Sequence, residues 1–205
     1  MSLDELCRGV EGPLSWTARR LPTPISNEFR PMVAELAPLL DCCDGFYAFN
    51  RALHVFPIRG PASGLDLIQW NDVDLWRNSF GGLTKGLFFF AEDVFGDQFA
   101  LCHGEVVRFS PDTALLDWFA PNLISWAESV MSDPDFTVGR AVADWWQLNE
   151  RPIPFGKRLL PKVLSTRSDA YDPGNLMECN AVEGMRYRAD TALRLKRLHT
   201  DRRSP

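Results

Sequence analysis

A succession of short β-favouring segments joined by tight turns constrains the fold of this chain most. Leu87–Phe90 is a fully apolar run typical of a central strand, and further segments follow at 98–102, 105–109 and 115–119. His103-Gly104 is a two-residue turn of the kind that closes a hairpin. Because parallel strands need long crossover connections, these segments predict an antiparallel sheet.

Helical patterns lie on both sides of these strands. Residues 27–40 and 123–131 repeat apolar side chains at helical spacing, and 137–148 does so behind a capping threonine. A capping-box-like pair, Asn71 and Asp74, predicts a short helix that ends at Gly81-Gly82. The order of helices, strands and helices predicts an α+β fold with an antiparallel sheet flanked by helices.

Charge divides the chain into unequal parts. We distinguish a Pro-rich N-terminal lead (1–26), an α+β domain (27–150) and a basic C-terminal extension (151–205). The first 150 residues hold 21 acidic and 10 basic side chains, whereas the remainder holds 6 acidic and 12 basic ones. Opposite charges attract, so we expect the extension to pack back on the domain as an arm. Leu193, Leu195 and Leu198 favour a helix over its segment 182–198, whereas Tyr187 and Thr191 leave a strand open as the alternative.

Composition excludes several classes of protein. No apolar run is long enough to span a membrane, and the first residues lack a secretory signal pattern. The five cysteines show no paired spacing typical of zinc ligands, so we expect a cytoplasmic protein with reduced thiols and without metal or cofactor. Between Glu92 and Asp135 there are nine carboxylates and one base. Such a segment repels nucleic acid and attracts cationic partners.

Catalytic patterns are weak. Cys102 and His103 are neighbours, but adjacent residues of a strand point to opposite faces and cannot form a nucleophile–base pair. A small acid/base hydrolase using Asp93, Asp97 and His103 stays open as an alternative, and it requires these side chains to converge on one pocket.

Tryptophan is abundant, with seven in the chain. Trp118, Trp126 and Trp145 lie on segments with regular apolar periodicity, so we expect all three to be buried or half-buried in the core.

The residues between 70 and 126 resemble a known family. Trp70-Asn71, the segment 87–99 with its Gly96-Asp97 turn, the hairpin strand 106–109 and the helix containing Trp126 are similar to bacterial members of the SUKH superfamily, which includes the Knr/Smi-like proteins. The similarity covers roughly residues 27–150, and Gly96 and Asp97 match the Gly-Asp turn of that family. The resemblance implies an α+β domain that works by binding, and many bacterial members are immunity proteins that neutralise polymorphic toxins, often nucleases.

These observations lead to one main hypothesis. We expect a non-enzymatic binding protein of the immunity type, whose partner is a cationic toxin domain and not nucleic acid. A regulatory or scaffold protein of the same fold is the alternative that also needs only a binding surface. The predicted partner-binding rim is acidic and consists of Glu92, Asp93, Asp97, Glu105 and Asp112.

Overall fold

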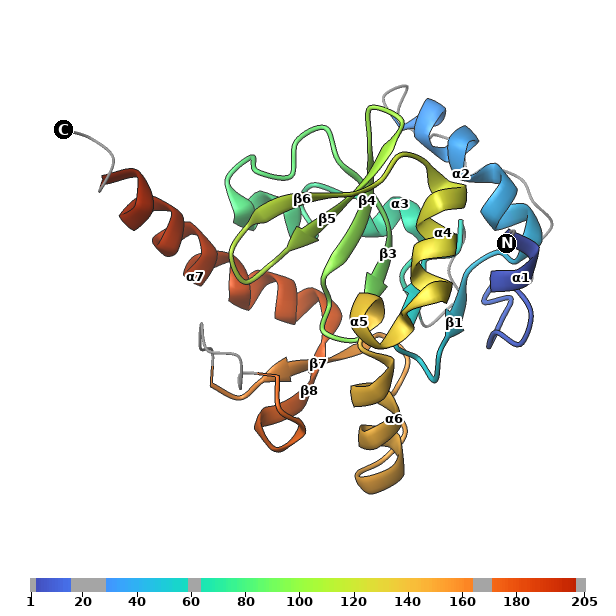
Figure 1. Cartoon of the computed structure of the whole chain (residues 1–205). Helices are drawn as coiled ribbons and strands as arrows, with labels where there is room; N and C mark the ends of the chain where they lie inside the picture. Colours follow the sequence, from blue (N-terminus) through green and yellow to red (C-terminus); the bar gives the residue numbers. More distant parts are fainter. Residues whose placement is uncertain (1–2, 16–28, 59–63, 164–170, 202–205) are drawn as a thin grey trace.

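A six-stranded antiparallel sheet lies at the centre of the molecule (Figure 1). The computed structural model describes residues 3–15, 29–58, 64–163 and 171–201. The strands follow one another across the sheet in chain order: β1 (Phe46–Ala48), β2 (Leu53–Val55), β3 (Phe88–Asp93), β4 (Gln98–Cys102), β5 (Glu105–Ser110) and β6 (Leu115–Ala120). Every neighbouring pair is antiparallel, which confirms the predicted α+β class.

Helices lie on both faces of this sheet (Figure 1). In chain order they are α1 (Leu3–Leu6), α2 (Arg30–Cys42), α3 (Leu67–Trp70), the 3-10 helix η1 (Arg77–Phe80), α4 (Leu123–Ser132), α5 (Pro134–Val138) and α6 (Arg140–Asn149). Among the described residues, no helix combines the length and apolar character that crossing a bilayer requires.

The alternation of β3 builds the two halves of the core. Phe89 packs on one face against Trp76, with ring centroids 5.0 Å apart. Phe90 points to the other face and meets Trp126 of α4 at 4.9 Å. Because successive residues of a strand face opposite sides, an unbroken aromatic run fits a strand that is covered by helices on both faces.

The short helix predicted from Asn71 forms only at its C-terminal end, as η1, which ends at Gly81 as predicted, while the predicted start and cap are wrong. The α-helix α3 ends before Asn71, and only the 3-10 turn η1 follows. Asp66 and Gln69 form the capping box, at the start of α3. The Asn71 side chain instead pairs with the backbone of Phe89 in β3, donating to its carbonyl at 2.7 Å and accepting from its N–H at 2.8 Å.

The helix predicted at 137–148 is divided in two. Gly139 separates α5 from α6 with a φ of 73°, and a Cβ atom there would lie 2.7 Å from the Phe95 ring. The cap is Asp133, which accepts the N–H of Phe136 at 3.1 Å. Thr137 does not cap a helix, because its hydroxyl donates to the carbonyl of Asp133 at 2.6 Å.

The C-terminal extension packs back on the domain, as its charge predicts (Figure 1). It contains β7 (Lys157–Pro161), the 3-10 helix η2 (Pro173–Asn175), β8 (Leu176–Asn180) and α7 (Ala181–Asp201), and β7 pairs with β8 in a separate two-stranded sheet. Met185 and Ala189 of α7 belong to the main core cluster. Residues 3–15 of the predicted N-terminal lead are described: they contain α1, and Glu11 forms a β-bridge with Tyr47 of β1.

Candidate functional site

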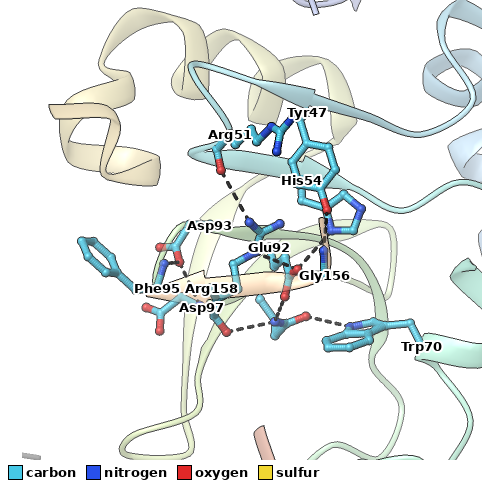
Figure 2. A network of polar contacts seen from close by, with 12 residues as sticks. Tyr47, Arg51, His54, Trp70, Glu92, Asp93, Phe95, Asp97, Gly156 and Arg158 are labelled. Atoms are coloured by element: carbon cyan, nitrogen blue, oxygen red, sulfur yellow. Dashed lines mark hydrogen bonds and ion pairs between the residues drawn. The ribbon is translucent and has the colours of Figure 1, made fainter. Parts of the chain in front are cut away.

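A network of buried polar side chains surrounds Glu92 of β3 (Figure 2). Its Oε1 atom accepts a hydrogen bond from Arg158 Nε at 2.8 Å and lies 3.0 Å from His54 Nδ1. Its Oε2 atom accepts from Gln98 Nε2 at 3.2 Å, and Gln98 in turn accepts from the Trp70 indole at 2.8 Å. Glu92 and Arg158 each have side chains only 1% exposed, so the pair is formed away from water.

Local strand geometry explains why these groups meet. His54 of β2 pairs directly with Glu92 of β3, so their side chains lie on the same face of the sheet. Tyr47 of β1 is the next cross-strand neighbour and stacks on His54 with ring centroids 4.3 Å apart. The Arg158 guanidinium lies 5.3 Å from the Tyr47 ring centroid, and the Tyr47 hydroxyl accepts the Gly156 N–H at 3.2 Å. One edge of the central sheet is thereby joined to the arm.

The pKa values in this network follow from burial and pairing. Burial acts to raise the pKa of Glu92, but Arg158 and the hydrogen bonds from His54 and Gln98 outweigh it and lower the pKa to about 2. Burial lowers the pKa of His54, and its hydrogen bond to Glu92 only partly opposes this. At neutral pH the carboxylate is therefore ionised and the imidazole is neutral. His54 Nδ1 donates to Glu92, and Nε2 carries the lone pair.

A cavity of about 710 Å³ adjoins the network. His54 and Glu92 contribute to its lining, and residues of the arm form another part of its wall. Its aromatic lining comes from both parts of the chain and consists of Tyr47, Phe56, Trp70 and Phe155. The described residues of the lining include no serine, threonine or cysteine that could act as a nucleophile.

A second charged cluster lies where β3 turns into β4. Arg108 Nη2 donates to Asp93 at 2.5 Å, and its Nε donates to Asp97 at 3.1 Å. The other oxygen of Asp93 accepts the backbone N–H groups of Phe95 and Asp97, both at 2.9 Å. Burial raises the pKa of Asp93 to about 7. The Arg108 guanidinium acts to lower this pKa, but it is shared with Asp97, whose own charge raises the pKa further. These contacts fix the turn.

Arg188 of α7 closes the same turn from the arm. It donates to the carbonyls of Phe95 at 2.9 Å and Gly96 at 3.3 Å, and lies 3.6 Å from a carboxylate oxygen of Asp112. Gly96 has a φ of 79°, and a Cβ atom there would lie 2.7 Å from Arg188 Nη2. The glycine of the family-like Gly-Asp turn is thus required by backbone conformation and by the close approach of the arm.

The structure contradicts the predicted acidic rim. Glu92 and Asp93 are buried and paired with arginines, so neither reaches the surface. Asp97 and Asp112 are half-buried and have ion-pair partners as well. Only Glu105 is exposed, and it begins β5, whereas Asp112 follows the end of that strand. The reason is physical: a dense group of carboxylates at a sheet end is stable when arginines neutralise it.

The hydrolase constellation is also absent from the described fold. Asp97 immediately precedes β4, and His103 follows the opposite end of that strand. Asp93, Asp97 and His103 therefore do not converge. Sequence reasoning instead missed His54 and Arg158, which are 38 and 66 residues from Glu92. The only sequence signal was a carboxylate two residues after an aromatic strand run.

The outer strand β6 is a second candidate site. Leu115, Leu116 and Trp118 are 58%, 46% and 61% exposed. The prediction of a buried or half-buried side chain is therefore wrong for Trp118 and for Trp145, which is 39% exposed, whereas Trp126 is buried as predicted. The Trp118 indole donates to Glu105 at 3.2 Å. Asp117 lies between the leucines and the tryptophan and is exposed.

Comparison of the chain with known proteins gives no match from which the role of either site could be inferred. No protein-family model, no curated protein and no solved structure matches the chain.

Proposed function

We propose that the protein is a non-enzymatic binding module that captures a cationic protein along β6. The observation that supports this is the exposure of large apolar side chains on that strand: Leu116 and Trp118 lie on one face of β6, and Leu115 lies on the other. Contiguous exposed apolar side chains on an edge strand favour association, and monomeric proteins usually cover or charge them.

The position of β6 adds a backbone component to this surface. Within the described sheet, β6 pairs only with β5, so its other edge offers free N–H and C=O groups. An extended segment of a partner can add to such an edge by main-chain hydrogen bonds, with side chains providing specificity. Tryptophan is among the residues that most often dominate binding energy, which makes Trp118 the expected anchor.

Charge indicates the chemistry of the partner. Glu105 accepts the Trp118 indole N–H, Asp117 lies beside Trp118 in the chain but on the other face of β6, and Asp112 lies in the turn that leads into β6. A second copy of this chain paired edge to edge would bring these like charges together, whereas a basic protein would neutralise them. The binding surface that we propose thus keeps Glu105 and Asp112 from the predicted rim and replaces the buried carboxylates by Asp117 and the exposed apolar side chains of β6.

The resemblance to SUKH proteins narrows the proposal to an immunity-type role. In that role the partner is a basic toxin domain delivered between competing cells, and the protein neutralises it in the cytoplasm. The five cysteines are all free thiols in the structure, which is consistent with a reducing compartment.

The test begins with affinity purification of the tagged chain from its native host and identification of the co-purified protein. The purified partner is then titrated against wild type, Trp118→Ser and Phe136→Ser. Phe136 is the matched control, since it is an aromatic residue 82% exposed on α5. We expect Trp118→Ser to weaken binding by about tenfold or more, added salt to slow association, and Phe136→Ser to bind normally. Equal affinities for all three proteins would contradict the proposal.

A further inference from the structure

The cavity next to Glu92 is separate from the β6 surface and has the composition of a small-molecule site. Its volume of about 710 Å³ falls within the range of roughly 300–1,000 Å³ that is usual for ligand pockets. Ligand pockets are mostly apolar with a few convergent polar groups, and here aromatic rings surround His54 and Glu92.

His54 presents a vacant hydrogen-bond acceptor to this cavity. Its Nδ1 atom is directed at Glu92, and its ring stacks on Tyr47. Within the described part of the chain, Nε2 has no hydrogen-bond partner, and the atom is not sealed inside the protein. His54 is only 6% exposed and lines the cavity. Glu92 orients its ring, and Nε2 offers one lone pair to a ligand.

The electrostatics of the lining favour an uncharged ligand. Among the described lining residues, the formally charged groups are Glu92 and Glu11, and each already has an arginine partner. Arg158 neutralises Glu92 at 2.8 Å, and Arg51 neutralises Glu11 at 2.5 Å. A charged ligand would lose its hydration without gaining a free counter-charge in the cavity.

The aromatic composition of the lining favours a flat ring. Phe56 and Trp70 stack with centroids 4.6 Å apart and an interplanar angle of 22°. Tyr47 stacks on His54, and Phe155 of the arm meets Tyr47 at 5.3 Å. Phe155 remains 58% exposed, and Arg51 lies over its ring at 4.3 Å. Aromatic walls of this kind bind planar rings by offset stacking and edge contacts.

We propose that the cavity binds an uncharged planar aromatic molecule that donates one N–H or O–H hydrogen bond to Nε2 of His54. The ring lies among Tyr47, Phe56, Trp70 and Phe155, and Glu92 holds the imidazole in the tautomer that accepts the bond.

The test uses indole and 1-methylindole as probes on the full chain. The two molecules have the same ring system, but 1-methylindole lacks the N–H donor. We expect indole to bind saturably with a dissociation constant on the order of 1 mM or lower, as its size allows, and 1-methylindole to bind about tenfold more weakly. Calorimetric or fluorescence titration measures both affinities.

His54→Asn is the variant that separates the acceptor from the network. The shorter amide can still donate to Glu92 from the position of Nδ1, while the position of Nε2 becomes empty. We expect this variant to bind indole as weakly as wild type binds 1-methylindole. Equal binding of the two probes to wild type would overturn the proposal, and so would an absence of saturable indole binding.

A spectroscopic readout keeps the test valid if the variant fails to fold. Long-range ¹H–¹⁵N correlation spectra distinguish the two ring nitrogens in each of the three histidines of the chain. In wild type we expect indole to shift the Nε2 resonance of His54 and leave its Nδ1 protonated. An unchanged Nε2 resonance at saturating indole would overturn the proposal without affecting the β6 binding surface.

Discussion

Arg158 and Glu92 form an ion pair at 2.8 Å although 66 residues separate them, and both side chains are 1% exposed. One residue belongs to the arm and the other to the central sheet. Removing one member of a buried ion pair strongly destabilises the folded protein, because the remaining charge has neither water nor a partner. The arm is therefore a structural part of the domain core.

We expect Arg158→Met to lower the free energy of unfolding by about 3–5 kcal/mol, because Glu92 remains buried without its cation. The double variant Arg158→Met/Glu92→Gln should recover part of this loss, since it buries no uncompensated charge. Urea denaturation of the four proteins of the cycle measures the coupling.

A matched control uses the ion pair between Arg151 and Glu178, which also lies in the C-terminal extension. The Arg151 side chain is 68% exposed, so water screens its ion pair and Arg151→Met should change the free energy of unfolding far less than Arg158→Met. Similar losses for Arg151→Met and Arg158→Met would contradict the importance of burial.

Stability should decrease on acidification because of Glu92. The folded-state pKa of Glu92 is lowered to about 2 from an ordinary value of 4.5, so its contribution is complete above pH 4.5 and is lost as pH falls towards 2. Asp93 acts in the opposite direction: its pKa is raised to about 7, so its contribution declines as pH rises from about 3.8 to 7. Comparing wild type with Glu92→Gln isolates the first effect. The variant should lose less stability between pH 4.5 and 2 in urea titrations, and parallel losses would argue against it.

Gly96→Ala should destabilise the protein more than Gly104→Ala. Both glycines have positive φ, 79° and 84°, so each substitution carries a conformational cost of about 1–2 kcal/mol. A Cβ atom at Gly96 additionally lies 2.7 Å from Arg188 Nη2, whereas at Gly104 nothing lies within 4 Å. We expect a difference of at least about 1 kcal/mol by thermal or urea unfolding. Equal values would mean that Arg188 moves aside freely.

The fragment 27–150 should not fold by itself. It lacks Arg158 and Arg188, so Glu92 and the carbonyls of the Phe95–Gly96 turn lose their buried partners. It also exposes the core surface that Met185 covers. We expect no cooperative unfolding transition by circular dichroism, whereas the whole chain shows one. A fragment with cooperative unfolding would show that the arm is dispensable.

Local sequence patterns predicted the strands from Phe88 to Ala120 and the helix α4 well, because short turns and apolar periodicity are local properties. They also predicted that the basic arm returns to the acidic domain. The hairpin of β7 and β8 was missed, since it is two short strands separated by a long connection.

The candidate sites were less predictable because they depend on contacts distant in sequence. The nine carboxylates between Glu92 and Asp135 indicated an acidic surface. In the fold, however, Arg108, Arg158 and Arg188 form ion pairs with some of these carboxylates below the surface. The exposure of Trp118 depends on β6 being the last strand of the sheet, and periodicity does not reveal strand order. His54 and Glu92 meet only through the pairing of β2 with β3.

The chain-order arrangement of the sheet keeps the two proposed sites apart. Tyr47, His54 and Glu92 come from the first three strands, whereas Trp118 comes from the sixth. A bound protein and a bound small molecule would not compete for space, so each could occupy the molecule while the other is present. Any influence of one on the other would have to pass through the intervening strands β4 and β5, whose aromatic packing is shared by both halves of the core.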